Sequence, residues 1–494
     1  MAIKLLTYDK MAQCETLVIG VFSDKKMNVT GLPKHAEALL QRLQTLGDIA
    51  GKSGEIHVLY PEGPGPRRLI VCGLGESVRL GSAEISKALG RAVKRAQALK
   101  AKDAALAVDT FAGKLLTPER MAETAALTGV LAMYQYQEMK SLPALGDRVT
   151  FPRLYLVSRN PAAISRAADA GEVIGEAVNY ARTLANRPGN KLYPQKLAEE
   201  ARALARRHAQ LGVSVMLSAQ LAKTGFGALT AVGGGSAHPP VLIELKYRGG
   251  KLKDAPVVLV GKGITFDAGG ISLKPPAKME DMKFDMSGGA AVLGIFKAVA
   301  ELRLPVNLVG IIPAAENLPS GSACRPGDVV KSLSGQTIEI INTDAEGRLI
   351  LADALTYALR HKPAQIIDMA TLTGAVVVAL GNAASGLISN HEALAAELQA
   401  AGELSGERTW RLPLWDEYRE LLKSEVADMS NMGSKPGAGT VVGAAFLEKF
   451  VEATPWAHLD IAGTAYGDAG PVFAKGATGA GIRLLVQWLR QRKA

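Results

Sequence analysis

The chain contains 494 residues, of which 48% are hydrophobic and 21% charged, and its formal net charge is +10. This composition is typical of globular proteins and excludes a disordered, collagen-like or coiled-coil chain. The length predicts at least two domains, because single hydrophobic cores stop growing at about 250–300 residues. No apolar run approaches the ~20 residues of a membrane span, and the N-terminus lacks the apolar stretch of a secretory signal. We therefore expect a cytoplasmic protein.

The first third of the chain alternates between strand-like and helix-like segments. Short apolar runs predict strands, and apolar residues three or four apart predict helices. The predicted strands are 15–23, 55–61, 67–75 and 148–158, and the predicted helices are 36–46 and 83–99. This order is typical of a small α/β layer domain, which we assign to residues 1–162. Residues 1–165 carry 22 Lys and Arg against 15 Asp and Glu, so most of the excess positive charge lies here.

A long helical pattern follows this domain. Residues 163–187 keep helical periodicity with little turn punctuation, and the run Arg187-Pro188-Gly189-Asn190 is a strong stop signal. We therefore assign residues 163–190 to a connecting helix.

Residues 191–494 are expected to form a larger α/β catalytic domain. The predicted strands are 256–266, 305–314, 364–372 and 456–462, and the predicted helices are 289–302, 348–362 and 440–452. Two strand-like pieces within 328–342 are separated by Ser334-Gly335, which predicts a hairpin. Apolar runs such as VVLVG indicate strands covered on both faces, so we expect a mixed, mostly parallel sheet between helices.

Four short segments of this domain place charges at predicted strand ends, where α/β folds build their sites. They are 260–270, 271–276, 279–289 and 342–348. Taken singly, their aspartates could be helix caps and their lysines solvated loop residues. Together, Asp267, Asp285, Asp344 and Glu346 need about two divalent ions to offset their charge. The seven histidines and three cysteines show no metal-binding spacing, so oxygen atoms would be the main ligands.

These segments carry a family resemblance. NTDAEGRL at 342–349, VGKGITFDAGGISLKP at 260–275 and MKFDMSGGAAV at 282–292 resemble, in order and spacing, the signatures of the leucyl (cytosol) aminopeptidase family. The members of this family are dinuclear metallo-exopeptidases, and the resemblance is to the bacterial aminopeptidase A type. It covers residues 165–494 in detail and extends loosely over the variable N-terminal α/β domain.

The resemblance implies two bridged divalent ions, Mn or Zn, with Mg or Co as alternatives. One ion would be held by Lys262, Asp267, Asp285 and Glu346, and the other by Asp267, Asp344 and Glu346. A lysine amine can bind a metal only when neutral, which adjacent dications favour. The ions would activate a water that attacks the scissile carbonyl.

The resemblance also assigns the remaining roles in the reaction. Lys274 would be the electrophile that stabilises the oxyanion, and a bicarbonate at Arg348 would be the general base. Asp285 would bind the free α-amine of a peptide, preferably one that begins with leucine or another apolar residue. The positions that match the family's substrate pocket are Met282, Asn342, Thr371, Leu372 and Gly374. The resemblance further implies a homohexamer with the catalytic domains at its centre.

Three other interpretations compete with this one. Some bacterial relatives bind DNA, and Lys87, Arg91, Lys94 and Arg95 fall on one face of the predicted helix 83–99, although a solvated basic face would look the same. A two-metal site could instead act on phosphoesters, but the chain has no phosphate-binding loop of P-loop spacing. A metal-free structural relative is disfavoured because every ligand position is filled.

Overall fold

The computed structural model describes residues 3–25, 27, 31–112, 116–141 and 153–492. The chain divides into two compact units. Unit 1 consists of Met1–Asn179 and Asp468–Lys475, and unit 2 of Tyr180–Gly467 and Gly476–Ala494. Residues 468–475 thus group with unit 1, whereas the sequence pattern predicted a catalytic domain over all of 191–494. No helix of the described residues is both long enough and apolar enough to cross a membrane.

Unit 1 contains a six-stranded sheet in the order β1-β6-β5-β2-β4-β3, and only the β3–β4 pairing is antiparallel among its described pairs. The strands are β1 (Lys4–Leu6), β2 (Thr16–Phe22), β3 (Ile56–Leu59), β4 (Arg68–Gly75), β5 (Asp103–Ala107) and β6 (Arg153–Val157). The helices are α1 (Lys34–Leu46), α2 (Ser82–Ala98) and α3 (Pro118–Met133), with 3-10 turns η1 (Tyr8–Gln13) and η2 (Val108–Phe111). The first part of the strand predicted at 148–158 lies outside the described residues.

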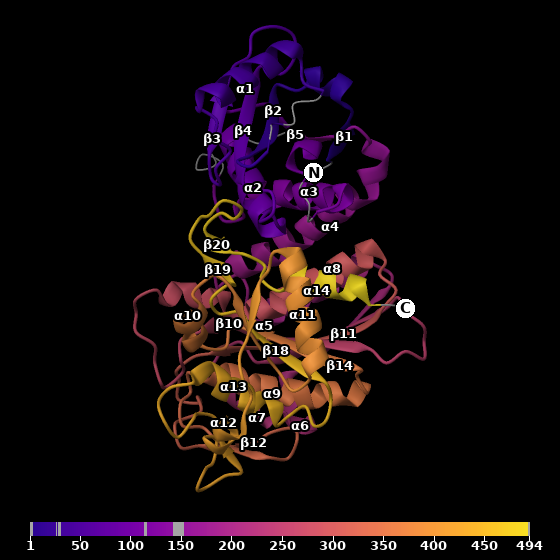
Figure 1. The fold of residues 1–494 in the computed structure, drawn as a ribbon. Helices are drawn as coiled ribbons and strands as arrows, with labels where there is room; N and C mark the ends of the chain where they lie inside the picture. The colour runs from indigo at the N-terminus through magenta and orange to yellow at the C-terminus, as the bar shows by residue number, and fades with distance from the viewer. Residues whose placement is uncertain (1–2, 26, 28–30, 113–115, 142–152, 493–494) are drawn as a thin grey trace. The chain divides into compact units, whose positions relative to one another are not determined.

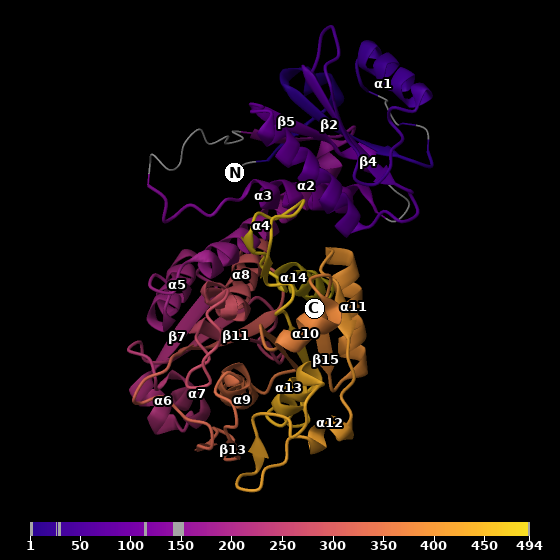
Figure 2. The same ribbon diagram turned by 90° about the vertical axis from the view of Figure 1, so that its left-hand side faces the viewer.

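Both faces of this sheet are buried. Leu17 and Ile19 of β2 pack with Leu40 of α1, whereas Val18 packs with residues of α2 and α3. Helix α1 therefore covers one face and helices α2 and α3 cover the other (Figure 2). Successive side chains of a strand point to opposite faces of the sheet, so the continuous apolar run of β2 contacts helices on both sides.

A 26-residue helix, α4 (Pro161–Asn186), lies over the segment that was predicted to connect the domains. The division between the two units falls inside it, between Asn179 and Tyr180. Pro161 stands at its first position, where a proline costs no hydrogen bond.

Unit 2 is built on a large mixed sheet in the order β16-β15-β18-β14-β9-β11-β8-β7, with β10 also paired to β11. Its strands are β7 (Leu211–Leu217), β8 (Val241–Arg248), β9 (Val257–Gly261), β10 (Gly263–Asp267), β11 (Asn307–Asn317), β14 (Gln365–Ala370), β15 (Ser385–Ser389), β16 (Thr409–Arg411) and β18 (Trp456–Asp460). The central strands β18, β14, β9 and β11 are parallel. The expected mixed, mostly parallel sheet of an α/β fold is confirmed.

Helices cover both faces of this sheet. They are α5 (Pro194–Arg207), α6 (Ser218–Thr224), α7 (Gly227–Gly233), α8 (Ser287–Leu302), α9 (Glu346–Ala358), α10 (Gly374–Leu380), α11 (Glu392–Ser405), α12 (Asp416–Glu420), α13 (Gly439–Glu448) and α14 (Ile482–Gln491), with the 3-10 turn η5 (Leu359–His361) after α9. Helices α8, α11 and α14 lie on one side, and α7, α9 and α13 lie on the other (Figure 1).

Two small sheets complete unit 2. Strands β12 (Val329–Lys331) and β13 (Thr337–Glu339) form the hairpin predicted around Ser334-Gly335, and β13 also pairs with β17 (Met429–Ser430). Strands β19 (Tyr466–Gly467) and β20 (Gly476–Ala477) form a separate pair.

The strand predicted over residues 256–266 is two strands in the structure. Strands β9 and β10 both run parallel to β11, and Lys262 lies at the break between them. The Lys262 backbone N–H donates to the Met369 carbonyl at 3.0 Å, so the backbone stays paired to β14 although the strand is interrupted. The break therefore places a lysine at the carboxyl edge of the sheet.

Candidate metal centre

The candidate centre begins where β9 and β10 end. The Lys262 side chain is 3% exposed, and Asp267, the last residue of β10, is 2% exposed. Both are too costly to bury without partners of opposite charge. Asp267 Oδ1 accepts hydrogen bonds from the Gly269 backbone N–H at 2.9 Å and from Asn317 Nδ2 at 2.8 Å, which fixes its orientation.

A tight loop after Asp267 returns Lys274 to the site. Gly270 has φ of +64°, and a Cβ there would lie 2.6 Å from Asn317 Oδ1, so a glycine is required. Lys274 Nζ then lies 2.8 Å from Asp267 Oδ2 and 2.5 Å from Asp344 Oδ1. Unlike Lys262, the Lys274 side chain is 21% exposed and can face a substrate.

Asp285 enters from the 3-10 turn η4 (Met279–Met286), immediately before α8. Its carboxylate lies 2.8 Å from Lys262 Nζ, and the hydroxyl of Thr371 donates to its Oδ1 at 2.7 Å. The Lys262 amine also donates to the Thr371 carbonyl at 3.0 Å. Thr371, directly after β14, therefore orients both charged groups.

Asp344 and Glu346 come from the segment between β13 and α9. Glu346 is the first residue of α9, and its Oε1 lies 2.7 Å from Lys262 Nζ. The next residue must be small, because a Cβ on Gly347 would lie 2.6 Å from Lys262 Cε. The Asn342 side chain accepts from the Asp344 backbone N–H at 2.8 Å and holds the turn.

The structure brings the five predicted metal ligands together. Asp267, Asp344 and Glu346 each offer an oxygen within 4.8 Å of the other two, and Asp285 joins them through Lys262. Three of the carboxylate oxygens, one each on Asp285, Asp344 and Glu346, lie within 2.8 Å of a lysine amine and have no other polar partner among the described residues. Four carboxylates thus face two lysines, and this negative, oxygen-rich donor set fits divalent cations.

The pKa values show how strongly these groups interact. Burial raises the pKa of Asp267, Asp285 and Asp344, and neighbouring carboxylates raise it further, whereas the lysines oppose the shift. Burial would lower the pKa of Lys262, but Asp285, Glu346 and Asp267 outweigh it and raise this pKa well above its ordinary value. The lysine ammonium is therefore a counter-charge for the carboxylates in this arrangement.

Arg348, on the first turn of α9, is a buried cation beside this cluster. Its Nη1 donates to the Asn431 carbonyl at 2.7 Å, while its Nε has no hydrogen-bond partner in the described structure. Burial lowers its pKa to about 10. A buried guanidinium with an unused donor is suited to a small anion.

The predicted substrate residues are placed unevenly. Thr371 contacts the cluster directly, and the Leu372 backbone N–H donates to Asp460 at 3.2 Å. Met282 lies on η4 with Asp285, and Gly374 is the exposed first residue of α10. The Asn342 side chain accepts a hydrogen bond within its own turn, from the Asp344 backbone N–H.

A groove of about 840 Å³ adjoins Arg348. Its walls come from α10, from the loop 432–438 and from α13, and most lining side chains are small or apolar. Val378 of α10 is 91% exposed at this groove.

Sequence reasoning missed two asparagines that support the site. Asn317 Nδ2 donates to Asp267 and to the Thr343 carbonyl at 2.9 Å, and Asn431 Oδ1 accepts from the Ile341 backbone N–H at 2.8 Å. Asn317 ends β11, so a polar residue at the carboxyl end of an apolar strand was the available signal.

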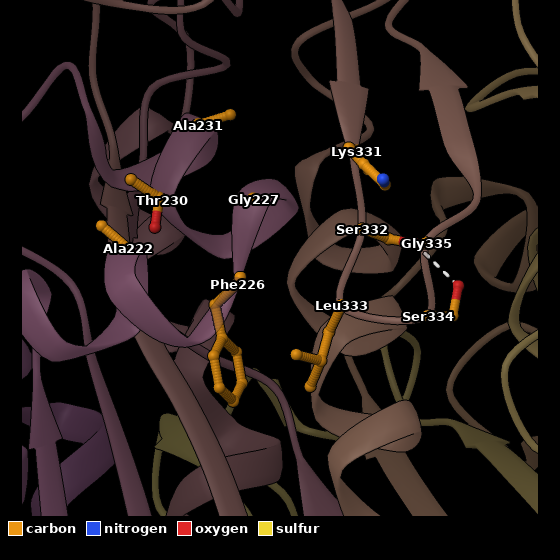
Figure 3. Close-up of a pocket in the computed structure, with 11 residues that line it drawn as sticks. Ala222, Phe226, Gly227, Thr230, Ala231, Lys331, Ser332, Leu333, Ser334 and Gly335 are labelled. Carbon is orange, nitrogen blue, oxygen red and sulfur yellow. Dashed lines mark hydrogen bonds between the residues drawn. The ribbon is translucent and has the colours of Figure 1, made fainter.

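A second cavity, of about 770 Å³, lies away from the metal centre. Phe226 and Thr230 line one side of it and Lys331 and Leu333 the other, between α7 and the β12–β13 hairpin (Figure 3). None of the predicted site residues lines it. Behind it, the buried Asp353 of α9 accepts from the backbone N–H groups of Leu229 at 2.9 Å and Leu333 at 2.7 Å.

Asp353→Ala is expected to destabilise unit 2. The substitution leaves the N–H groups of Leu229 and Leu333 buried without acceptors, which should cost at least about 2 kcal/mol. Chemical denaturation would measure the loss, with Asp328→Ala as the control, because Asp328 lies near the surface in an ion pair with Arg325. Equal unfolding midpoints for the two variants would contradict this role of Asp353.

The four basic residues predicted to contact DNA lie on α2 in unit 1. Lys87 and Arg95 are exposed and Arg91 is half-buried. Lys94 Nζ instead donates to the backbone carbonyls of Gly470 and, at 2.8 Å, Phe473. Only part of the predicted basic face is therefore free to meet a polyanion.

Comparisons with known proteins agree with this geometry. Residues 179–486 match the description "Cytosol aminopeptidase family, catalytic domain", and residues 18–143 match "Cytosol aminopeptidase family, N-terminal domain". A "Probable cytosol aminopeptidase" of Nitrosococcus oceani is 45% identical over 481 residues, covering 96% of this chain and 95% of that protein. Another, from Geobacter sp. (strain M21), is 47% identical and covers 96% of each chain.

Solved structures give the same result. A mutant of tomato leucine aminopeptidase has a TM-score of 0.88 and 34% identity, and the match covers 99% of this chain and 97% of that one. The bottromycin maturation enzyme BotP in complex with Mn has a TM-score of 0.85 and 35% identity, over 97% of this chain and 99% of that one. The chain therefore belongs to the cytosol aminopeptidase family of metallo-exopeptidases.

Proposed function

We propose that this aminopeptidase removes N-terminal leucine and other apolar residues from peptides with the help of two divalent ions. The observation that carries the proposal is the buried convergence of Asp267, Asp344 and Glu346. Mn or Zn fits this donor set, with Mg or Co as alternatives. When bound, such a pair supplies Lewis acidity and activates a water for attack on the scissile carbonyl.

The ligands are proposed as two overlapping groups. Lys262, Asp267, Asp285 and Glu346 would hold one ion, and Asp267, Asp344 and Glu346 the other. Lys262 would have to lose a proton to bind a metal. The neighbouring carboxylates oppose this loss because they raise the pKa of Lys262, whereas dications bound to those carboxylates would favour it. The related BotP was solved in complex with Mn, which supports a metal in this protein as well.

The other residues of the centre act on the substrate. The free α-amine would bind one of the ions and donate a hydrogen bond to Asp285, which selects peptides with an unblocked N-terminus. Lys274 donates to the carbonyl oxygen as negative charge develops there. Arg348 fits a bicarbonate, which would supply a general base, since the carboxylates of the centre are already engaged.

Metal removal tests the proposal as a whole. Release of p-nitroaniline from leucine p-nitroanilide should stop after chelation and return when Mn or Zn is added to the dialysed protein. The full chain would be assayed under identical conditions in all three states. Undiminished activity in a chelated sample shown to be metal-free would contradict the two-metal proposal.

Lys274→Ala is expected to keep both metals but lower kcat more than it changes KM. The reason is that Lys274 stabilises charge that appears only in the transition state. Lys278→Ala is the matched control, because Lys278 lies exposed on the same loop. If metal content falls together with activity in Lys274→Ala, the lysine is a ligand or a structural residue instead.

DNA binding through α2 is a second candidate function, favoured by the exposure of Lys87 and Arg95. Contacts of this kind would be to phosphates, insensitive to sequence and weakened by salt. A gel shift with duplex DNA should be reduced in a Lys87→Ala, Arg95→Ala double variant. Absence of any shift for the unaltered chain near physiological salt would reject this function.

Assembly and location are also proposed from the family. A homohexamer with the catalytic domains at its centre would appear in light scattering as the mass of six chains. The names of the curated relatives, "cytosol aminopeptidase", support a cytoplasmic location.

A further inference from the structure

A row of polar side chains lies in the core of the large sheet, on β18 and its neighbour β14. Residues 371–373, which follow β14, form the loop next to this row. Trp456, His458 and Asp460 alternate along β18 and so project from the same face. His458 is in register with Asp368 on the neighbouring strand β14. His458, Asp368 and Asp460 are all 0% exposed. Such a row in a sheet core is costly unless its members satisfy one another.

His458 and Asp368 form a tight pair. His458 Nδ1 lies 2.6 Å from Asp368 Oδ1, and Trp456 Nε1 donates to Asp368 Oδ2 at 2.7 Å. Both oxygens of Asp368 are thus engaged, and the carboxylate assigns a proton to Nδ1 of His458. His458 Nε2 is buried without a hydrogen-bond partner in the described structure.

The charges in this row support one another. Burial would lower the pKa of His458, but Asp368 and Asp460 outweigh burial and the repulsion of Arg348, and the pKa is raised. Burial raises the pKa of Asp460, and His458 opposes that shift. A positive charge on His458 favours Asp460 as a carboxylate, the form that only accepts hydrogen bonds.

Asp460 uses its oxygens to hold the loop after β14. Its Oδ1 accepts from the backbone N–H groups of Leu372 and Ala462, each at 3.2 Å, and its Oδ2 accepts from the Thr373 hydroxyl at 2.7 Å. Because the Thr373 proton points to Asp460, the hydroxyl of Thr440, 2.9 Å away, must donate to Thr373. The loop is thereby fixed to β18 and to the start of α13.

The same loop touches two residues of the metal centre. The Thr371 carbonyl accepts from Lys262 Nζ, and the Thr371 hydroxyl donates to Asp285 Oδ1. Displacement of residues 371–373 would therefore move Thr371, which is a hydrogen-bond partner of both Lys262 and Asp285. Among the described contacts, His458 meets Asp368 and neither Lys262 nor Asp285, so its influence would pass through Asp460 and the loop.

We propose that His458 is a positioning residue for the peptidase reaction: paired with Asp368, it keeps Asp460 as the acceptor that holds residues 371–373 against Lys262 and Asp285. This inference rests on the roles proposed above for Lys262 and Asp285. It assigns a function to a buried histidine that would otherwise only fill the core.

The test compares three substitutions in the full, metal-loaded chain. His458→Asn keeps a donor toward Asp368 but removes the ionisable ring two residues before Asp460 on β18. It should retain its metals and lower kcat for Leu-Gly by about 10- to 100-fold, with a smaller change in KM. Thr373→Val removes one donor to Asp460 and should lower kcat in the same way. Thr373→Ser keeps the hydroxyl and should therefore keep the kcat of the unaltered chain.

Combining the substitutions shows whether they act on one path. If His458 works through Asp460 and the loop, the double variant His458→Asn, Thr373→Val should lose less than the product of the single losses. His361→Asn is the matched control, because His361 pairs with Glu244 at 3.1 Å elsewhere in unit 2. This control should retain the kcat of the unaltered chain.

Several results would overturn the inference. Unchanged kcat in His458→Asn, or a lower unfolding temperature with unchanged kcat, would reduce His458 to a core residue. Fully multiplicative losses would show that His458 and Thr373 act independently. If His458→Asn does not fold, unchanged kcat in Thr373→Val is enough to reject the path. Full activity of Glu346→Gln would instead refute the metal centre itself, so the two failures are distinguishable.

Discussion

Glu346→Gln and Asp344→Asn should each lower aminopeptidase activity by several orders of magnitude and release metal. Each substitution removes one negative ligand while keeping the size of the side chain. Glu346 is also 2.7 Å from Lys262 Nζ, so its loss leaves the lysine with one partner fewer. Metal content by atomic spectroscopy and kcat/KM for leucine p-nitroanilide would be measured on the same samples.

The matched control for these variants is Asp328→Asn. Asp328 also lies in a loop of unit 2, but it pairs with the exposed Arg325 at 2.9 Å and not with the metal centre. This control should keep both metal and activity. Near-normal turnover by either Glu346→Gln or Asp344→Asn would sink the assignment of a dinuclear centre.

Blocking the substrate's amine should abolish hydrolysis. Acetyl-Leu-Gly carries an amide nitrogen without an available lone pair, and the acetyl carbonyl would meet the carboxylate of Asp285. Leu-Gly and acetyl-Leu-Gly would be compared at equal metal loading, and only the first should be cleaved. Casein should be resistant to internal cleavage for the same reason.

The pH dependence provides an independent check on the amine. An α-ammonium has a pKa of about 7.7–8.0, and only the neutral amine can be a ligand. Hydrolysis of Leu-Gly should therefore rise from pH 7 and level off above that pKa. Comparable rates for the free and acetylated peptides would show that the amine is not recognised, and the exopeptidase mechanism would have to be abandoned.

Strong local patterns in the sequence predicted the elements that carry the site. Apolar runs identified β9, β11, β14 and β18, and the Ser334-Gly335 turn identified the β12–β13 hairpin. The break at Lys262 was not predicted, because the surrounding residues read as one strand. That break depends on packing against Gly288 and Gly347, which are distant in sequence.

Other parts of the fold lacked a local signal. Strand β5 is DAALA and helix α3 is rich in alanine, so neither has a clear period of apolar and polar residues. The charged segments were expected to converge, and the structure shows that they do. The supporting contacts of Asn317 and Asn431 could not be predicted, because each joins segments that meet only in the folded chain.

Unit 1 cannot finish folding until the segment 468–475 has been synthesised, because this segment belongs to unit 1. Helix α2 donates from Lys94 to carbonyls that lie 376 and 379 residues later in the chain. Residue 90 of α2 has to be a glycine because Pro471 packs closely against it. A Cβ at this position would lie 2.5 Å from the Pro471 carbonyl oxygen. During synthesis, α2 emerges from the ribosome long before its last partners exist. An early N-terminal folding intermediate would thus expose Lys94 and the surface around Gly90 until residues 470–473 have been synthesised.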